Sequence, residues 1–239
     1  MKTVKYFLLV IFIMISAAAA AAPRIIRFSG YEWIVRSSYG QTPPGPNYFS
    51  NSDDTIWVDN SGYLNLTIKN DQGHWLCCEI TSREKMGYGV YTIKLQGRID
   101  LLDPQTVFGF FTWDKQNPPL YSEIDIEFSK WGDPERDIGQ FTLQPYTEES
   151  NKHIFPIELD GELTTHIIVW EPEQIVFESW HGSEPGKYLI ARWVREGNGI
   201  PEPGKCTVHF NLWLFQGQPL QEAQNQHLAI REFSYDPLP

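Results

Sequence analysis

The chain has few cysteines, and their spacing excludes a disulfide framework as the basis of its fold. Only three occur among 239 residues, and Cys77 and Cys78 are adjacent. On a strand these two side chains face opposite sides, so at most one could easily pair with Cys206. With an odd count, one thiol stays free or bonds between molecules. No CxxC or HxxxH spacing occurs either, which predicts a functional site without a metal.

Basic residues are scarce, and this scarcity argues against partners that carry a strong negative charge. The chain has 19 basic and 30 acidic residues, a formal net charge of −11, and no basic run. Nucleic acids and anionic membranes attract proteins of the opposite charge, so neither is an expected partner. A neutral polymer such as a polysaccharide suits an acidic protein of this kind.

Long hydrophobic runs are absent except at the start of the chain. Lys2 and Lys5 precede an apolar run over Tyr6–Ile15, and the alanines up to Ala22 offer small-residue cleavage sites. This pattern is typical of a secretory signal peptide. The run is shorter than the roughly 20 residues of a spanning helix, although an uncleaved anchor is the alternative interpretation.

The expected domain organisation follows from that leader. We predict a signal peptide over residues 1–22 and a single domain over residues 23–239, secreted or periplasmic and free of the membrane after cleavage. No repeat or low-complexity linker divides the rest of the chain, and its length is normal for an all-β sandwich. We expect a monomer without a cofactor.

Helical periodicity is also absent, and short β-rich runs separated by Gly, Pro, Asn and Asp take its place. Such a succession predicts two packed antiparallel sheets. The expected strands are Ile25–Phe28, Thr55–Val58, Tyr63–Lys69, Cys77–Ser82, Gly89–Gln96, Val107–Trp113, Glu123–Phe128, Ile138–Leu143, Thr165–Trp170, Gln174–Ser179, Tyr188–Val194, Thr207–Phe215 and Leu228–Tyr235.

One of these runs carries three acids on a single face. Strict alternation from Glu123 to Phe128 places Glu123, Asp125 and Glu127 on one side of the strand and the apolar residues on the other. Adjacent like charges destabilise a fold, so their presence favours a function that needs carboxyl groups with different proton affinities. The alternative is an acidic edge strand that faces solvent and has no catalytic role.

Closely spaced carboxyl groups of this kind can hydrolyse a glycosidic bond. In a retaining mechanism Glu123 would attack the anomeric carbon while Glu127 protonates the leaving oxygen and later activates water. Asp125, between them, would orient one glutamate by a hydrogen bond and help keep a proton on the other.

The sequence around the acids resembles a known family. The segment from Glu123 to Phe128 is similar to the catalytic strand of glycoside hydrolase family 16, which includes lichenases, laminarinases and xyloglucan-active enzymes. The resemblance implies a β-jelly roll with a concave glycan-binding cleft, Glu123 as nucleophile, Asp125 as assistant and Glu127 as acid/base. In this family a metal, here a structural calcium, can sit on the outer sheet, and no ligands for it are assigned.

Further segments resemble the same family in the same order along the chain. They are Cys77–Ser82, Gly87–Tyr91, Phe110–Trp113, Gln140–Phe141, Val169–Pro172 and Phe210–Trp213. The resemblance implies six glycan contacts, which are Glu79, Phe111, Trp113, Tyr121, Asn211 and Trp213. Phe111 could instead be a core residue, and Glu79 could instead pair with a basic residue of the cleft.

Several positions depart from the family pattern. Thr81 stands where lichenases have a sugar-binding arginine, Thr142 stands where they have an asparagine, and Tyr121 replaces a tryptophan. His166 and His209 have no obvious carboxylate partner in the sequence and are expected in the core or in support of the site. These differences leave the identity of the glycan open.

The sequence therefore predicts a secreted retaining endo-β-glycosidase that cleaves internal linkages of a β-glucan-like polysaccharide. A transglycosylase would use the same three acids, because hydrolysis and transfer differ only in the acceptor. A glycan-binding β-sandwich without turnover is the main non-enzymatic alternative. A structural wall or coat protein is a further one, although it gives no reason for three aligned acids.

Overall fold

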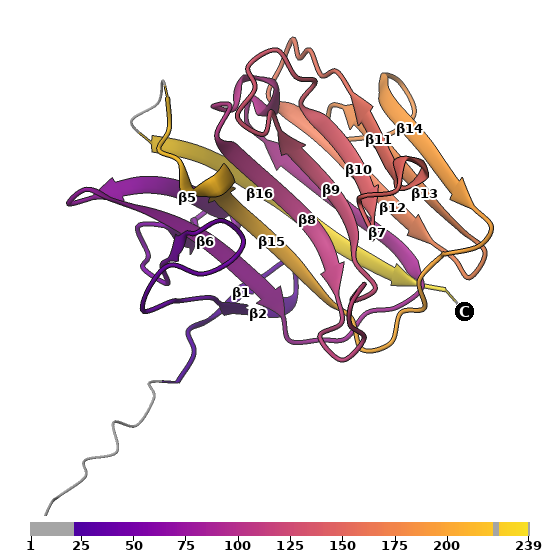
Figure 1. The fold of residues 1–239 in the computed structure, drawn as a ribbon, viewed down its shortest axis with the longest axis horizontal. Helices are drawn as coiled ribbons and strands as arrows, with labels where there is room; N and C mark the ends of the chain where they lie inside the picture. Colours follow the sequence, from indigo (N-terminus) through magenta and orange to yellow (C-terminus); the bar gives the residue numbers. More distant parts are fainter. Residues whose placement is uncertain (1–21, 222–224, 239) are drawn as a thin grey trace, which may run out of the picture.

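A computed structural model of the chain describes residues 22–221 and 225–238 (Figure 1). The predicted signal peptide lies almost wholly outside the described residues. Within them, no helix is both long enough and apolar enough to cross a membrane.

The described residues form two curved antiparallel layers, which confirms the predicted all-β jelly roll. The first sheet contains, in spatial order, β1 (Ile25–Phe28), β2 (Tyr31–Val35), β6 (His74–Ser82), β15 (Thr207–Leu214), β8 (Thr106–Trp113), β9 (Ile124–Ser129), β10 (Gly139–Leu143) and β11 (Lys152–Phe155).

The second sheet lies behind the first and joins it at one edge through the β5–β6 hairpin. Its strands, in spatial order, are β4 (Ile56–Val58), β5 (Leu64–Asp71), β16 (Asn225–Pro237), β7 (Gly89–Gln96), β12 (Leu163–Trp170), β13 (Gln174–His181) and β14 (Leu189–Glu196). The short β3 (Tyr48–Phe49) pairs with β6 in parallel.

The core fills the space between the two sheets with aromatic and aliphatic side chains. Phe110 and Phe210 of the first sheet pack against Phe233 of the second, with ring centroids 6.2 and 5.6 Å apart. Further along, Phe141 stacks on Phe177 at 5.1 Å. Because these alternating residues point inward, the polar residues between them on the first sheet must point to its other face.

Each of the thirteen predicted runs contains an observed strand, with bounds that shift by a few residues. Three observed strands, β2, β3 and β11, were not predicted. The cysteine pairing that the sequence leaves open is also settled, because Cys77, Cys78 and Cys206 are all buried free thiols. The fold therefore depends on the packing of its core.

Candidate active site

Asp125 and Glu127 lie on a central strand of the first sheet, and Glu123 lies just before it. β9 pairs with β8 on one side and β10 on the other, so the interpretation as an acidic edge strand is wrong. Ile124, Ile126 and Phe128 are fully buried in the core, as the alternation predicts. Asp125 and Glu127 consequently occupy the opposite face, where the sheet forms a cleft of about 450 Å³ that is lined by all three acids.

Glu123 lies just before β9, at the end of a bend in the β8–β9 connection. The two residues before it, Tyr121 and Ser122, have φ of 57° and 51°, in the left-handed region that non-glycine residues seldom adopt. Hydrogen bonds hold this bend, since the Ser122 carbonyl accepts from the Thr112 hydroxyl at 2.8 Å and the Ser122 hydroxyl donates to the Glu202 carbonyl at 2.7 Å. Backbone strain of this kind often accompanies a functional position.

Burial raises the pKa of all three acids, and repulsion by neighbouring carboxylates adds to the shift of Asp125 and Glu127. Burial raises the pKa of Glu123 to about 7, although hydrogen bonds with Asp125 and Gln144 oppose the shift. Asp125 is 4% exposed, and burial together with the charges of Glu123 and Glu127 raises its pKa well above the usual range. A protonated Asp125 can donate a hydrogen bond to Glu123, which favours the ionised form of Glu123.

Glu127 has its own set of partners. Burial and the charge of Glu123 raise its pKa to about 7, and the interactions with Gln140, Arg136 and Thr142 limit the rise. The Gln140 amide donates to Glu127 Oε2 at 3.0 Å and to the Thr142 hydroxyl at 2.9 Å. Arg136 Nη2 in turn donates to Gln140 Oε1 at 2.6 Å. This chain fixes the orientation of the Glu127 carboxyl group.

These raised pKa values predict a stability that depends on pH. A carboxyl group whose folded pKa lies above its unfolded value stabilises the fold at low pH, and this contribution is lost as pH rises through the folded pKa. We therefore expect the melting temperature to fall between about pH 4.5 and 7 more steeply in the natural protein than in Glu123→Gln/Glu127→Gln. Calorimetry across this range measures the difference, and equal slopes would contradict the raised pKa values.

A second polar cluster lies across the cleft on β6 and β15. Glu79 is 6% exposed and accepts from Arg36 Nη1 at 2.6 Å and lies 3.2 Å from His209 Nδ1. Burial opposes ionisation of Glu79, but the hydrogen bond with His209 and the charge of Arg36 outweigh it and lower its pKa. Arg36 also donates to the Pro43 carbonyl at 2.6 Å. This bond holds the loop that contains Pro43 against the wall of the cleft.

The middle of the cleft is kept open by a glycine. Gly109 on β8 lies between Glu127 on β9 and Asn211 on β15, and a Cβ at this position would lie 2.5 Å from Asn211 Oδ1. That buried amide oxygen has no hydrogen-bond partner among the described residues. Because buried acceptors are normally paired, it is a candidate acceptor for a ligand hydroxyl.

Gly109→Ala therefore tests the importance of this open floor. The added methyl group displaces the end of the Asn211 side chain, so glycan affinity should fall by about tenfold, the effect of one or two lost hydrogen bonds. The melting temperature should change little, since the displaced atom is at the end of a side chain. Ala191→Gly, which alters one buried methyl group on the second sheet, is the control. Unchanged glycan affinity would exclude Gly109 and Asn211 from the binding surface.

Aromatic side chains form the walls of the cleft. Phe111, Trp113 and Trp213 line it, and Phe111 stacks on His209 with ring centroids 4.8 Å apart. Phe111 is thus a cleft residue and not a core residue. Aromatic rings that border a cleft can stack on the apolar faces of sugar rings.

The structure brings together most of the residues predicted from the sequence. Glu79, Phe111, Trp113, Asn211, Trp213 and the three acids all line one cleft. Tyr121 does not line it directly and stacks on Trp113 at 4.1 Å and 13°, so it supports the wall. Glu79 has the basic partner that the sequence left open, and His209 has a carboxylate partner that the sequence did not reveal.

Four cleft residues were missed by sequence reasoning, namely Arg36, Pro43, Pro44 and Gly109. Arg36 follows β2, a strand that was not predicted, and the two prolines lie in a turn outside every predicted strand and every segment that resembles the family. His166, in contrast, lies in the core, bonded to the hydroxyls of Ser179 and Thr164 at 2.8 Å. Burial lowers its pKa to about 3, so it stays neutral.

The family resemblance allows for a structural calcium ion, for which the sequence assigns no ligands. Across residues 22–221 and 225–238, no group of three or more His, Cys, Asp or Glu side chains could hold a metal ion.

Comparisons with known proteins establish the fold. No protein-family model matches the sequence, and no curated protein sequence matches it. Among solved structures, a β-glucanase of Bacillus licheniformis superposes with a TM-score of 0.65 and 18% identity over 85% of this chain and 91% of that one. A β-1,3-1,4-glucanase (lichenase) derived from a mouse hindgut metagenome gives 0.64 and 21% over 86% and 93%.

A third similar structure is described as a pseudo β-1,3-glucanase of Mycobacterium tuberculosis. Its TM-score is 0.63, with 18% identity over 83% of this chain and 88% of that one. The resemblance to glycoside hydrolase family 16 is thus confirmed at the level of the fold. At these identities the fold is what the proteins share, and activity has to be argued from the site.

Proposed function

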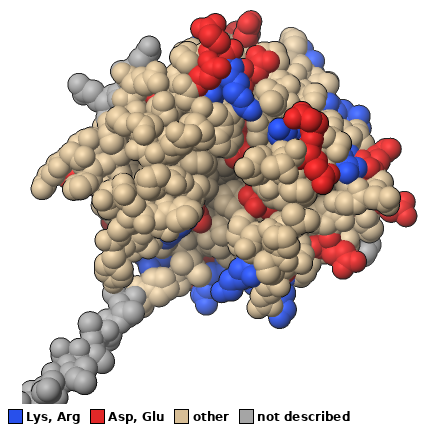
Figure 2. All heavy atoms as spheres, in the orientation of Figure 1, with Lys and Arg blue, Asp and Glu red and all other residues tan. Residues whose placement is uncertain are grey.

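We propose that this protein is a retaining endo-β-glycosidase that hydrolyses internal linkages of a polysaccharide. The observation that carries the proposal is the cluster of three acids at β9, with Glu123 just before the strand and Asp125 and Glu127 on it, along the floor of an open cleft with aromatic walls. Figure 2 shows this cleft as a hollow, with acidic side chains visible inside it. An open cleft accepts the middle of a polymer, as internal cleavage requires.

The reaction proceeds by double displacement. Glu123, ionised, attacks the anomeric carbon as the bond to the leaving oxygen breaks, and Glu127 donates its proton to that oxygen. Glu127, now ionised, takes a proton from water, whose oxygen attacks the same carbon and displaces Glu123. Protonated Asp125 donates a hydrogen bond to Glu123, and the Gln140 amide holds the Glu127 carboxyl group in position.

This mechanism predicts a bell-shaped dependence of kcat/KM on pH with its maximum near neutrality. Activity requires ionised Glu123 and protonated Glu127, whose pKa values burial raises to about 7. The hydrogen bond with Asp125 favours ionisation of Glu123 first, so Glu123 sets the acidic limb and Glu127 the alkaline limb. A rate that stays constant from pH 7 down to pH 4 would contradict this assignment.

Two rival functions share the same site. A transglycosylase would pass the glycosyl group from Glu123 to a sugar hydroxyl, and nothing in the cleft distinguishes the two acceptors. A binding protein without turnover is the second rival, since one structural neighbour is described as a pseudo-glucanase. The intact hydrogen-bond chain that ends on Glu127 favours catalysis over binding alone.

Incubation with a glycan panel tests the proposal. The panel comprises β-glucans, xyloglucan, agar and carrageenan, with products resolved by size, and Glu123→Gln is the control. Hydrolysis predicts shorter products from the natural protein alone, and longer products would indicate transfer. If both proteins bind a glycan equally and neither changes it, the enzymatic function is excluded.

We also propose that the protein is exported, on the basis of its basic and apolar N-terminal segment. Mass spectrometry of the protein from culture medium or periplasm should show a chain that begins between residues 19 and 23. An intact Met1 on cell-bound protein would favour the uncleaved anchor.

A further inference from the structure

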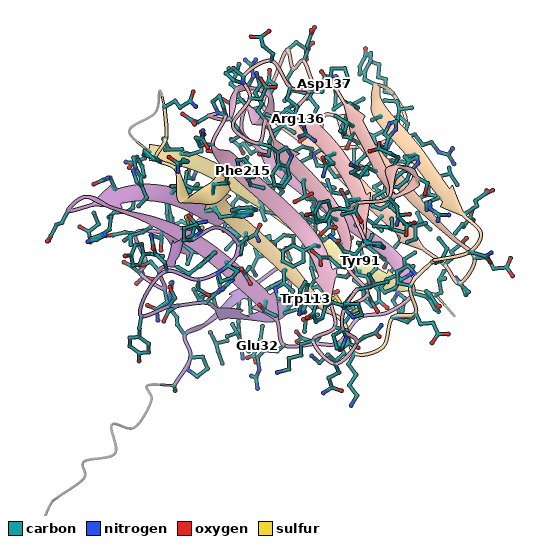
Figure 3. The ribbon with its side chains drawn as sticks, viewed as in Figure 1. Glu32, Tyr91, Trp113, Arg136, Asp137 and Phe215 are labelled. Atoms are coloured by element: carbon teal, nitrogen blue, oxygen red, sulfur yellow. The ribbon has the colours of Figure 1, made fainter. Side chains whose placement is uncertain are left out.

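A second hollow adjoins the cleft at Trp113 and His209. It has a volume of about 400 Å³ and shares two lining residues, Trp113 and His209, with the cleft. Its other walls come from β2, from the end of β6, from the start of β15 and from the loop after β8. In Figure 3, Trp113 and Glu32 mark this end of the face, and Arg136 and Phe215 mark the opposite end. A polymer lying in the cleft can therefore extend into this hollow.

The walls of the second hollow are basic. Arg83, Lys85, Lys115 and Lys205 line it, and Asp114 is the one lining carboxylate. All four basic side chains are exposed, and Figure 2 shows basic atoms gathered along this edge of the hollow. The sequence has no basic run, so the fold assembles this cluster from three separate segments of an acidic chain.

The one carboxylate in the walls of this hollow is already engaged. The two carboxylate oxygens of Asp114 accept from the backbone N–H groups of Gln116 and Lys205 at 2.9 and 2.8 Å. These bonds lower the pKa of Asp114, with a further contribution from the charges of Lys85 and Lys205. Asp114 therefore ties the two loops together, which holds the lysines at the rim.

Glu32 pairs with Arg83, the fourth basic residue of the hollow, and it is shared between Arg83 and Arg27. It accepts from Arg83 Nη1 at 2.5 Å and from Arg27 Nη2 at 3.0 Å. Within residues 22–221 and 225–238, Lys85, Lys115 and Lys205 form no ion pair. Three unpaired ammonium groups around one hollow repel each other and attract an anion.

We propose that this hollow is a basic subsite that binds an anionic substituent, a sulfate ester or a uronate carboxylate, on the polysaccharide in the cleft. The inference rests on the proposed function and names the class of its substrate. The sequence alone predicted a neutral polymer from the net charge. The local charge of the cleft, and not the net charge of the chain, governs which glycan binds beside Glu123.

Binding experiments with matched glycans test the subsite independently of catalysis. The protein carries Glu123→Gln, so that bound glycans are not cleaved. Two backbones are tested, β-1,3-glucan and agarose oligosaccharides, each in neutral, sulfated and C6-oxidised form, and calorimetry gives Kd. We expect at least one charged form to bind about tenfold or more tightly than its neutral parent in dilute buffer. The advantage should shrink at about 0.5 M salt because of screening.

Two pairs of substitutions locate the effect. Lys85→Gln/Lys205→Gln removes charge from the subsite, and Lys69→Gln/Lys187→Gln removes equal charge from elsewhere on the surface. The first pair should weaken binding of the charged glycan by about tenfold and leave the neutral parent within about twofold. The second pair should change neither. A stronger response to sulfate than to carboxylate, or the reverse, identifies the natural substituent.

The outcomes separate the subsite from the proposed function. If no charged glycan binds more tightly than its parent, or if both lysine pairs respond alike, the basic subsite is excluded, even when hydrolysis is observed. If charged glycans bind through Lys85 and Lys205 but the natural protein cleaves none, the subsite stands and the enzymatic function fails.

Discussion

Glu123→Ala should abolish turnover of the natural glycan, with kcat reduced by about 10³-fold or more, the loss typical of a missing nucleophile. The fold should persist, because Glu123 lies at the cleft and outside the core. Glycan affinity should also persist, because the aromatic walls and Asn211 are unaffected. Product release measured over hours gives the residual rate, and Glu196→Ala, an exposed acid on β14, is the control.

Small anions then test the role of Glu123 itself. Alanine leaves space beside the anomeric carbon, and azide can occupy it. The nitrogen of azide forms the bond to that carbon while Glu127 protonates the leaving oxygen, so the product is a glycosyl azide of inverted configuration. Rescue by azide with this configuration supports Glu123 as nucleophile. An unchanged rate of hydrolysis in Glu123→Ala would exclude that role.

Glu127→Ala should reduce activity on the polysaccharide by about 10² to 10⁴-fold, the usual contribution of a general acid. A dinitrophenyl glycoside carries a leaving group that needs no proton. With this substrate, the variant should therefore form the glycosyl-enzyme at a rate within about tenfold of that of the natural protein. Hydrolysis of the glycosyl-enzyme, the second step, lacks its base without Glu127 and becomes slow. We therefore expect a burst of dinitrophenol followed by a slow phase.

Stopped-flow absorbance measures that burst, and azide should accelerate the slow phase because an anion needs no base. Gln140→Ala, which removes the amide that orients Glu127, should show a smaller loss on the polysaccharide and no burst. Equal losses on the polysaccharide and on the dinitrophenyl glycoside would contradict the role of Glu127 as acid.

The local pattern of β9 was enough to predict which side chains enter the core and which enter the cleft. Alternation is a property of a single strand, so it can be read from the six residues Glu123 to Phe128. For Phe111 and Trp113 on β8 and for Asn211 and Trp213 on β15, the resemblance to the family supplied the prediction, and all four line the cleft. Where the sequence expected a strand of this kind, the structure has one.

Contacts between distant segments could not be predicted in this way. His209 and Glu79 are 130 residues apart, and Arg36 is 43 residues from the same glutamate. The basic subsite arises similarly, because Lys85, Lys115 and Lys205 meet only when three loops close around one end of the first sheet. Such groupings depend on strand order and register, which hydrophobic periodicity does not specify.

The configuration of the first product tests the central claim most directly. Proton nuclear magnetic resonance can follow the anomeric signal of the new reducing end in the first minutes of the reaction, before mutarotation. Double displacement through Glu123 predicts that the β-anomer appears first and the α-anomer follows by mutarotation. Initial appearance of the α-anomer, or no new reducing end from any glycan of the panel, would contradict the account.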